Sequence, residues 1–96
     1  MNVTQSKRNI KKDISYLTYE VVSDCYTFMY LHPDNEKEKA VKIISEVLQM
    51  QDELITKVNH VPSKDSKEVK QYFKQIYTDL FAKVDQSFTE LSKLTR

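Results

Sequence analysis

The 96-residue chain contains no glycine, and this absence restricts its fold more than any other feature of the sequence. Glycine supplies the positive-φ positions that most β-hairpins and β-bulges need, so a β-rich fold is disfavoured. Glycine-rich phosphate-binding loops are excluded as well, because their motifs cannot be written without glycine. We therefore expect an all-α protein, and we expect no cofactor.

Two prolines, Pro33 and Pro62, divide the chain into three segments of similar length. Proline disfavours helical geometry at the residue before it, so each proline marks the end of a helix. Short connections between long helices make neighbouring helices antiparallel, which predicts an up-down-up three-helix bundle in one domain. The domain covers residues 1–96, and its predicted helices span about 6–31, 35–60 and 66–94.

The second and third helices each have a start signal in the turn before them. Asn35 and Glu38 have the three-residue spacing of a capping box, and Asp34 is a competing cap. Asp65 and Glu68 repeat that spacing ahead of the third helix. A helix start is therefore expected in both turns.

Apolar residues recur at helical spacing in all three segments, and they predict the core. In the first helix these residues are Ile10, Ile14, Leu17, Val21, Cys25, Phe28 and Leu31. In the second helix they are Ala40, Val41, Ile44, Val47, Leu48, Leu54, Ile55 and Val58. In the third helix they are Val69, Tyr72, Phe73, Ile76, Tyr77, Leu80, Val84, Phe88, Leu91 and Leu94.

The first helix carries a second apolar face on its far side, whereas the other two helices have polar outer faces. We call it the tyrosine face, and it consists of Tyr19, Val22, Tyr26, Met29 and Tyr30. Only Glu20 and Asp24 are charged between Asp13 and Leu31. A small bundle can cover one face of this helix with its own chain but not both, so the second face predicts a partner that covers it.

Tyrosine and methionine are enriched in the cores of protein interfaces, where lysine and glutamate are depleted. The tyrosine face therefore predicts a homodimer, most simply a two-fold dimer in which the first helix packs on its symmetry mate and completes the bundle. A different protein partner is the alternative occupant. A third possibility is that these tyrosines are ordinary surface residues, since tyrosine tolerates solvent.

Few residues of the sequence are candidates for metal binding or catalysis. His32 and His60 end different helices, at opposite poles of an up-down-up bundle, so they cannot share a metal ion within one chain. Each suits a helix C-terminus, where the helix dipole favours positive charge. Neither follows a glutamate by three residues, as the di-iron motif of helical bundles requires. We expect no metal site.

Cys25 falls on the core face, where a thiol behaves as a small inert hydrophobic group. Asp24 lies beside that face, level with Lys42 or Lys83, and either pairs with one of them or reaches solvent at the rim, which we favour. A second carboxylate cannot be placed beside Asp24, so an acid–base pair is missing. We expect no catalytic residue and no small-molecule substrate.

The formal net charge of +1 gives no general attraction to nucleic acid or to anionic lipid. The basic residues concentrate at the start of the first helix, at Lys7, Arg8, Lys11 and Lys12. No apolar run approaches the roughly 20 residues needed to cross a bilayer, and the N-terminus lacks the apolar core of a signal peptide. We expect a cytoplasmic protein without a membrane segment.

These features favour a non-enzymatic helical module for protein–protein interaction or assembly, self-associating through the tyrosine face. The alternative is a small nucleic-acid-associated factor that uses the basic start of the first helix. A third interpretation, a subunit that completes an enzyme only within a complex, has no support beyond the size of the chain.

Overall fold

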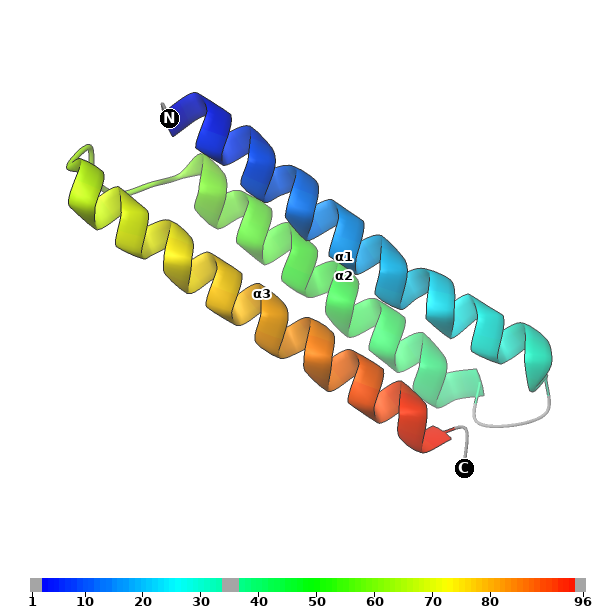
Figure 1. The fold of residues 1–96 in the computed structure, drawn as a ribbon. Helices are drawn as coiled ribbons and strands as arrows, with labels where there is room; N and C mark the ends of the chain where they lie inside the picture. Colours follow the sequence, from blue (N-terminus) through cyan, green and yellow to red (C-terminus); the bar gives the residue numbers. More distant parts are fainter. Residues whose placement is uncertain (1–2, 34–36, 95–96) are drawn as a thin grey trace.

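The computed structural model describes residues 3–33 and 37–94, and it consists of three helices joined by two short connections. The helices are α1 (Val3–Leu31), α2 (Lys37–Asn59) and α3 (Ser66–Leu94). They run up, down and up along a rod of 52 × 17 × 17 Å (Figure 1). The predicted all-α, up-down-up three-helix bundle is confirmed, and its completion by dimerisation stays a prediction.

The helix ends agree closely with those expected from the prolines. α3 covers the predicted residues, and α1 ends at Leu31 as predicted but begins at Val3, about one turn earlier. α2 ends at Asn59, one residue before the predicted end. Its expected start at residue 35, with the candidate caps Asp34 and Asn35, lies outside the described residues.

The start of α3 is capped by Asp65. Its Oδ1 accepts hydrogen bonds from the backbone N–H groups of Lys67, at 2.8 Å, and Glu68, at 3.4 Å. In a full capping box the Glu68 carboxylate would accept from the Asp65 N–H. Instead, that N–H donates to Oγ of Ser63 at 3.1 Å. The predicted cap is present, but a serine two residues upstream supplies its second half.

Two side chains satisfy carbonyl groups in the last turn of α2. Nδ1 of His60 lies 2.8 Å from the carbonyl oxygen of Thr56, and because a carbonyl only accepts, this nitrogen carries the proton. The hydroxyl of Tyr72 in α3 donates to the carbonyl of Lys57 at 2.9 Å. His60 therefore has the role at a helix C-terminus that the sequence suggested.

The core side of α1 is buried along most of its length. Among its predicted residues, Leu17 is partly buried, while Leu31 is exposed instead of buried. Tyr77 of α3 hydrogen-bonds Asp13 of α1, so these two residues are level. Leu31, at the last position of α1, is then level with the end of α3 and does not lie alongside its inner turns. The residues buried as predicted are Ile10, Ile14, Val21, Cys25 and Phe28.

The buried face of α2 is rotated from the predicted one. Val41 and Leu48 are exposed, while Ile43 and Met50, which were not assigned to the core, are buried. Apolar residues surround much of this helix, so periodicity alone leaves two overlapping faces open. Packing against both α1 and α3 selects the face that contains Ile43 and Met50.

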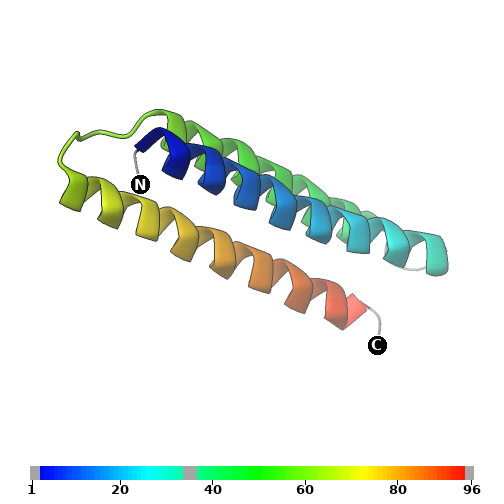
Figure 2. The same cartoon turned by 45° about the horizontal axis from the view of Figure 1, so that its top comes forward.

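The three helices do not contact one another equally. α1 packs most extensively against α2 and least against α3. Figure 2 shows α1 lying along α2, with α3 on the other side of the view. As a consequence, the flank of α1 that is turned toward α3 keeps Asp13, Glu20 and Asp24 exposed.

Candidate functional site

The outer side of α1 places three tyrosines of the tyrosine face in solvent. Tyr19, Tyr26 and Tyr30 expose 69%, 59% and 84% of their surface. They lie opposite the buried side of the same helix, since successive residues of an α-helix are 100° apart. The described part of the chain therefore leaves this line of aromatic rings uncovered.

The two aliphatic members of the tyrosine face are placed differently. Val22 and Met29 are partly buried and pack against the hydrophobic core. They project 100–120° from the centre of the core face, on the same flank as the buried Thr18, and contribute to the packing of α1 on the bundle. The exposed part of the tyrosine face is accordingly aromatic, and its aliphatic part forms an edge.

Tyr16 extends the aromatic surface on the opposite flank of α1. It is largely exposed, and Glu20 lies one turn further along the helix. A side-chain hydrogen bond with Glu20 raises the pKa of the Tyr16 hydroxyl, as does the negative charge of that carboxylate. Tyr16 therefore stays protonated at neutral pH, beside a negative charge at the edge of the tyrosine face.

The basic start of α1 divides into two pairs. Lys7 and Lys11 are partly buried, whereas Arg8 and Lys12 are exposed, and neither exposed cation has an ion-pair partner among the described residues. At 100° per residue, Arg8 and Lys12 lie within about 20° of the direction of Tyr19. The same line along α1 therefore begins with two cations and continues with three tyrosines. Helical angles alone predict this arrangement, although it was not among the features expected from the sequence.

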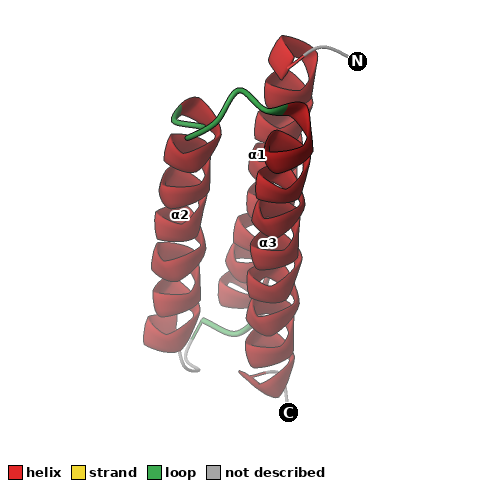
Figure 3. Ribbon diagram, turned by 90° about the vertical axis from the view of Figure 1, so that its left-hand side faces the viewer, coloured by secondary structure: helices red, strands yellow, loops and turns green. Residues whose placement is uncertain are grey.

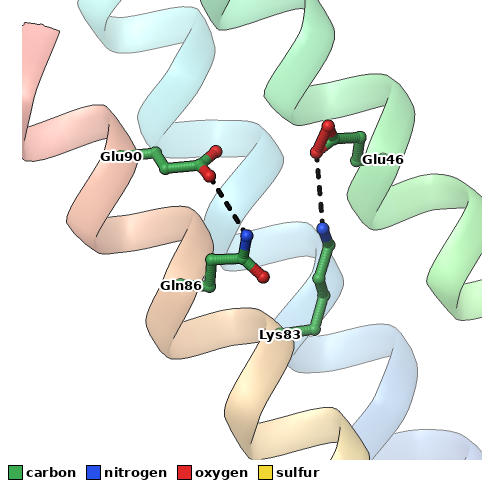
Figure 4. Close-up of polar contacts among 4 residues, drawn as sticks. All are labelled: Glu46, Lys83, Gln86 and Glu90. Carbon is green, nitrogen blue, oxygen red and sulfur yellow. Dashed lines mark hydrogen bonds and ion pairs between the residues drawn. The ribbon is translucent and has the colours of Figure 1, made fainter.

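Cys25 is fully buried, and burial raises the pKa of its thiol to about 11, with a smaller contribution from the charge of Asp24. Asp24 itself is exposed at the rim, as expected. Lys83, one of its two possible partners, instead pairs with Glu46 across α2 and α3, with Nζ 3.4 Å from Oε2 (Figure 4). A protonated, inaccessible thiol cannot act as a nucleophile at neutral pH.

The two histidines remain apart. α1 and α2 end at opposite ends of the bundle (Figure 3), so His32 and His60 are separated by the length of the rod. The ring of His32 packs on Phe28, with centroids 4.9 Å apart. Within residues 3–33 and 37–94, His, Cys, Asp and Glu side chains form no group of three that could hold a metal ion.

Two hollows of the described surface are shallow and open to solvent. One lies on α2, and a second lies between α2 and α3, next to the Lys83–Glu46 pair (Figure 4). Neither encloses space in which a small molecule could be held away from water. The first is lined by Asp52, Glu53, Thr56 and Lys57. The second is lined by Glu46, Gln49, Met50, Glu53 and Lys83.

One exposed aromatic on α3 was not anticipated. Phe81 exposes 55% of its surface and stacks on Tyr77, with ring centroids 5.8 Å apart. It is not one of the residues of the tyrosine face, and it lies beside Tyr77, whose hydroxyl hydrogen-bonds Asp13 of α1. Its position outside the apolar periodicity of α3 was the signal that could have identified it.

No family model, curated protein or solved structure matches this chain. In the part of the chain that the structure describes, no helix is both long enough and apolar enough to cross a membrane.

Proposed function

We propose that this chain is a helical protein–protein interaction module that associates with itself through the tyrosine face of α1. One observation carries the proposal: Tyr19, Tyr26 and Tyr30 expose most of their surface along one line of a helix whose opposite side is the core. Tyrosine combines a large apolar ring with a polar hydroxyl, a combination that suits surfaces wet in one state and buried in another.

The size of the surface supports association. With Tyr16 included, the exposed tyrosine area is on the order of 500 Å² per subunit, given 150–250 Å² for a whole aromatic side chain. Exposed apolar patches of a few hundred Å² are often functional in monomers. Two such faces together would bury about 1,000 Å², near the lower limit for a specific interface. Val22 and Met29 add apolar area at the edge.

Sedimentation equilibrium tests the proposal. The wild-type chain, at 11.4 kDa, is expected to sediment with the mass of two chains. Tyr26→Glu should sediment as a monomer, because the substitution buries a carboxylate in the interface. Phe81→Glu is the matched control, since Phe81 is an aromatic of similar exposure, 55% against 59%, outside the tyrosine face. A monomeric wild type, or equal effects of both substitutions, would contradict the proposal.

We further propose that the module is non-enzymatic and works in the cytoplasm. The proposal that the module is non-enzymatic rests on the sequence, in which we find no acid–base pair and no activated nucleophile. Cys25 supports the cytoplasmic location, because a buried free thiol suits a compartment in which cysteines stay reduced. Because Cys25 is buried, we expect the purified chain to dimerise equally well with and without a reducing agent.

A nucleic-acid-associated role is the second candidate, and the exposure of Arg8 and Lys12 favours it. Contacts with phosphate release counterions, so such binding weakens steeply as salt rises. An electrophoretic shift with duplex DNA that is lost in Arg8→Glu and falls between 50 and 200 mM salt would support this candidate. Failure to shift DNA at low salt would exclude it.

A further inference from the structure

The outer line of α1 is symmetric in spacing about Tyr19. Lys12 and Tyr26 lie equally far from it along the sequence (12, 19, 26), and so do Arg8 and Tyr30 (8, 19, 30). All four lie within about 20° of the direction of Tyr19 around the helix. Cations therefore occupy one half of the line, and aromatic rings occupy the equivalent positions of the other half.

Ser15 and Ser23 complete this pattern (15, 19, 23). They lie within about 40° of the same direction. Small side chains at these positions allow two helices to approach to the 8–10 Å at which helices pack. The cations precede Tyr19 and the serines lie to either side of its direction, so Tyr19, Tyr26 and Tyr30 still form one continuous line along the helix.

We infer that two copies of this chain pair α1 with α1 in an antiparallel orientation, about a two-fold axis at Tyr19, so that Lys12 faces Tyr26 and Arg8 faces Tyr30 of the second copy. The inference rests on the proposed self-association and adds to it the orientation, the register and the contacts. Each contact occurs twice, because the axis relates the two copies.

The chemistry of the facing residues is complementary. A lysine or arginine over the face of a tyrosine ring is attracted by the ring quadrupole. A parallel pair would instead place Arg8 against Arg8 and Lys12 against Lys12, and like charges repel. The antiparallel orientation removes this repulsion and gives both Arg8 and Lys12 an aromatic partner.

The ends of α1 support the same orientation. α2 and α3 each have an acidic residue in the first turn and a basic residue in the last turn, as the helix dipole favours. Within Val3–Leu31, α1 has neither. Antiparallel pairing would place Arg8 of the second copy beside Tyr30, in the last turn of α1, and so supply the missing positive charge from outside the chain.

Exchange of one facing pair tests the register. Lys12→Glu places a carboxylate against the Tyr26 ring, and Tyr26→Lys places an ammonium group against Lys12. We expect each single substitution to raise the dissociation constant about tenfold or more. The double variant Lys12→Glu/Tyr26→Lys should bind more tightly than either single variant, because the introduced charges then face each other with opposite sign, although the Tyr26 ring is lost. Lys74→Glu, at an exposed site on α3, is the control and should leave the constant unchanged.

The outcomes separate the inference from the proposed function. A wild-type dimer whose double variant is as weak as the weaker single variant would overturn the antiparallel register and leave self-association standing. A wild type that stays monomeric at all concentrations would overturn both. Circular dichroism and thermal unfolding of each variant establish that every chain compared is folded.

Thiol cross-linking gives an independent measurement, in a Cys25→Ala background. Tyr19→Cys should form covalent dimers with a short bifunctional maleimide, because the two substituted sites meet at the axis. Tyr30→Cys should not, because the antiparallel pair separates these sites by about 33 Å, at 1.5 Å per residue. Efficient cross-linking of Tyr30→Cys as well as of Tyr19→Cys would overturn the inference in favour of a parallel pair, which brings both sites face to face.

Discussion

The hydroxyl of Tyr77 donates a hydrogen bond of 2.6 Å to Oδ2 of Asp13 and thereby joins α3 to α1. These two helices have the least extensive contact in the bundle. One short hydrogen bond to a carboxylate therefore makes up a larger share of their interaction than it would between the other helices. Phe81, which is itself exposed, stacks on the Tyr77 ring. The bond fixes the register of two parallel helices that do not follow each other in the chain.

Loss of this bond should destabilise the bundle modestly. Tyr77→Phe is expected to lower the free energy of unfolding by about 1 kcal/mol, since water can still solvate the Asp13 carboxylate. The melting temperature should fall by about 4–8 °C for a domain of this size. A double-mutant cycle with Asp13→Ala, which removes the acceptor, followed by urea denaturation, measures the coupling. Additive losses would show that the bond contributes nothing to stability.

The same contact predicts how stability changes in alkaline solution. Burial, followed by the hydrogen bond to Asp13, raises the pKa of Tyr77 to about 12 from the ordinary 10.0. Between these values the folded chain keeps a proton that the unfolded chain releases, so stability falls as pH rises through this window and is fully retained below about 10. The free energy of unfolding should fall less steeply from pH 10 to 12 in Tyr77→Phe than in the wild type. Parallel pH profiles would contradict this assignment.

Cys25 should be unreactive in the folded chain. The thiolate is the reactive species, and burial raises the pKa of this thiol to about 11, so little thiolate forms at pH 8. We expect the native chain to react with a disulfide reagent about a hundredfold more slowly than the chain unfolded in urea. Equal rates in both states would show that the thiol is accessible.

The sequence predicted the elements well because their signals are local. Pro33 and Pro62 fix where helices end, and the apolar periodicity of α3 is strong enough that its predicted bounds match. The Asp65 cap was likewise visible as a spacing. Such features depend on residues only a few positions apart, so the rest of the fold does not alter them.

Features that depend on packing were predicted less well. The face of α2 that includes Ile43 was missed because neighbouring helices, not the pattern of α2 itself, choose between overlapping apolar faces. The bond between Tyr77 and Asp13 depends on the register of helices 64 residues apart in sequence. For the tyrosine face, the tyrosines were correctly expected to point outward, but the partial burial of Val22 and Met29 at its edge required the position of α1 in the bundle.

The buried hydroxyl of Thr18 offers a way to stabilise the bundle. Thr18 is 1% exposed, and its Oγ1 has no hydrogen-bond partner among the described residues. An unpaired buried hydroxyl costs free energy that a methyl group of similar size does not. Thr18→Val should therefore raise the free energy of unfolding by about 1 kcal/mol and the melting temperature by about 4–8 °C.

Thr27 is the matched control, on the same helix. It is exposed, and its Oγ1 donates to the carbonyl of Ser23 at 3.0 Å, so its hydroxyl is already satisfied. Thr27→Val should change the free energy of unfolding by no more than about 0.5 kcal/mol. Both substitutions introduce the same side chain into the same helix, so the difference between them isolates the unpaired hydroxyl. If Thr18→Val were no more stable than Thr27→Val, the Thr18 hydroxyl must find a partner in solution.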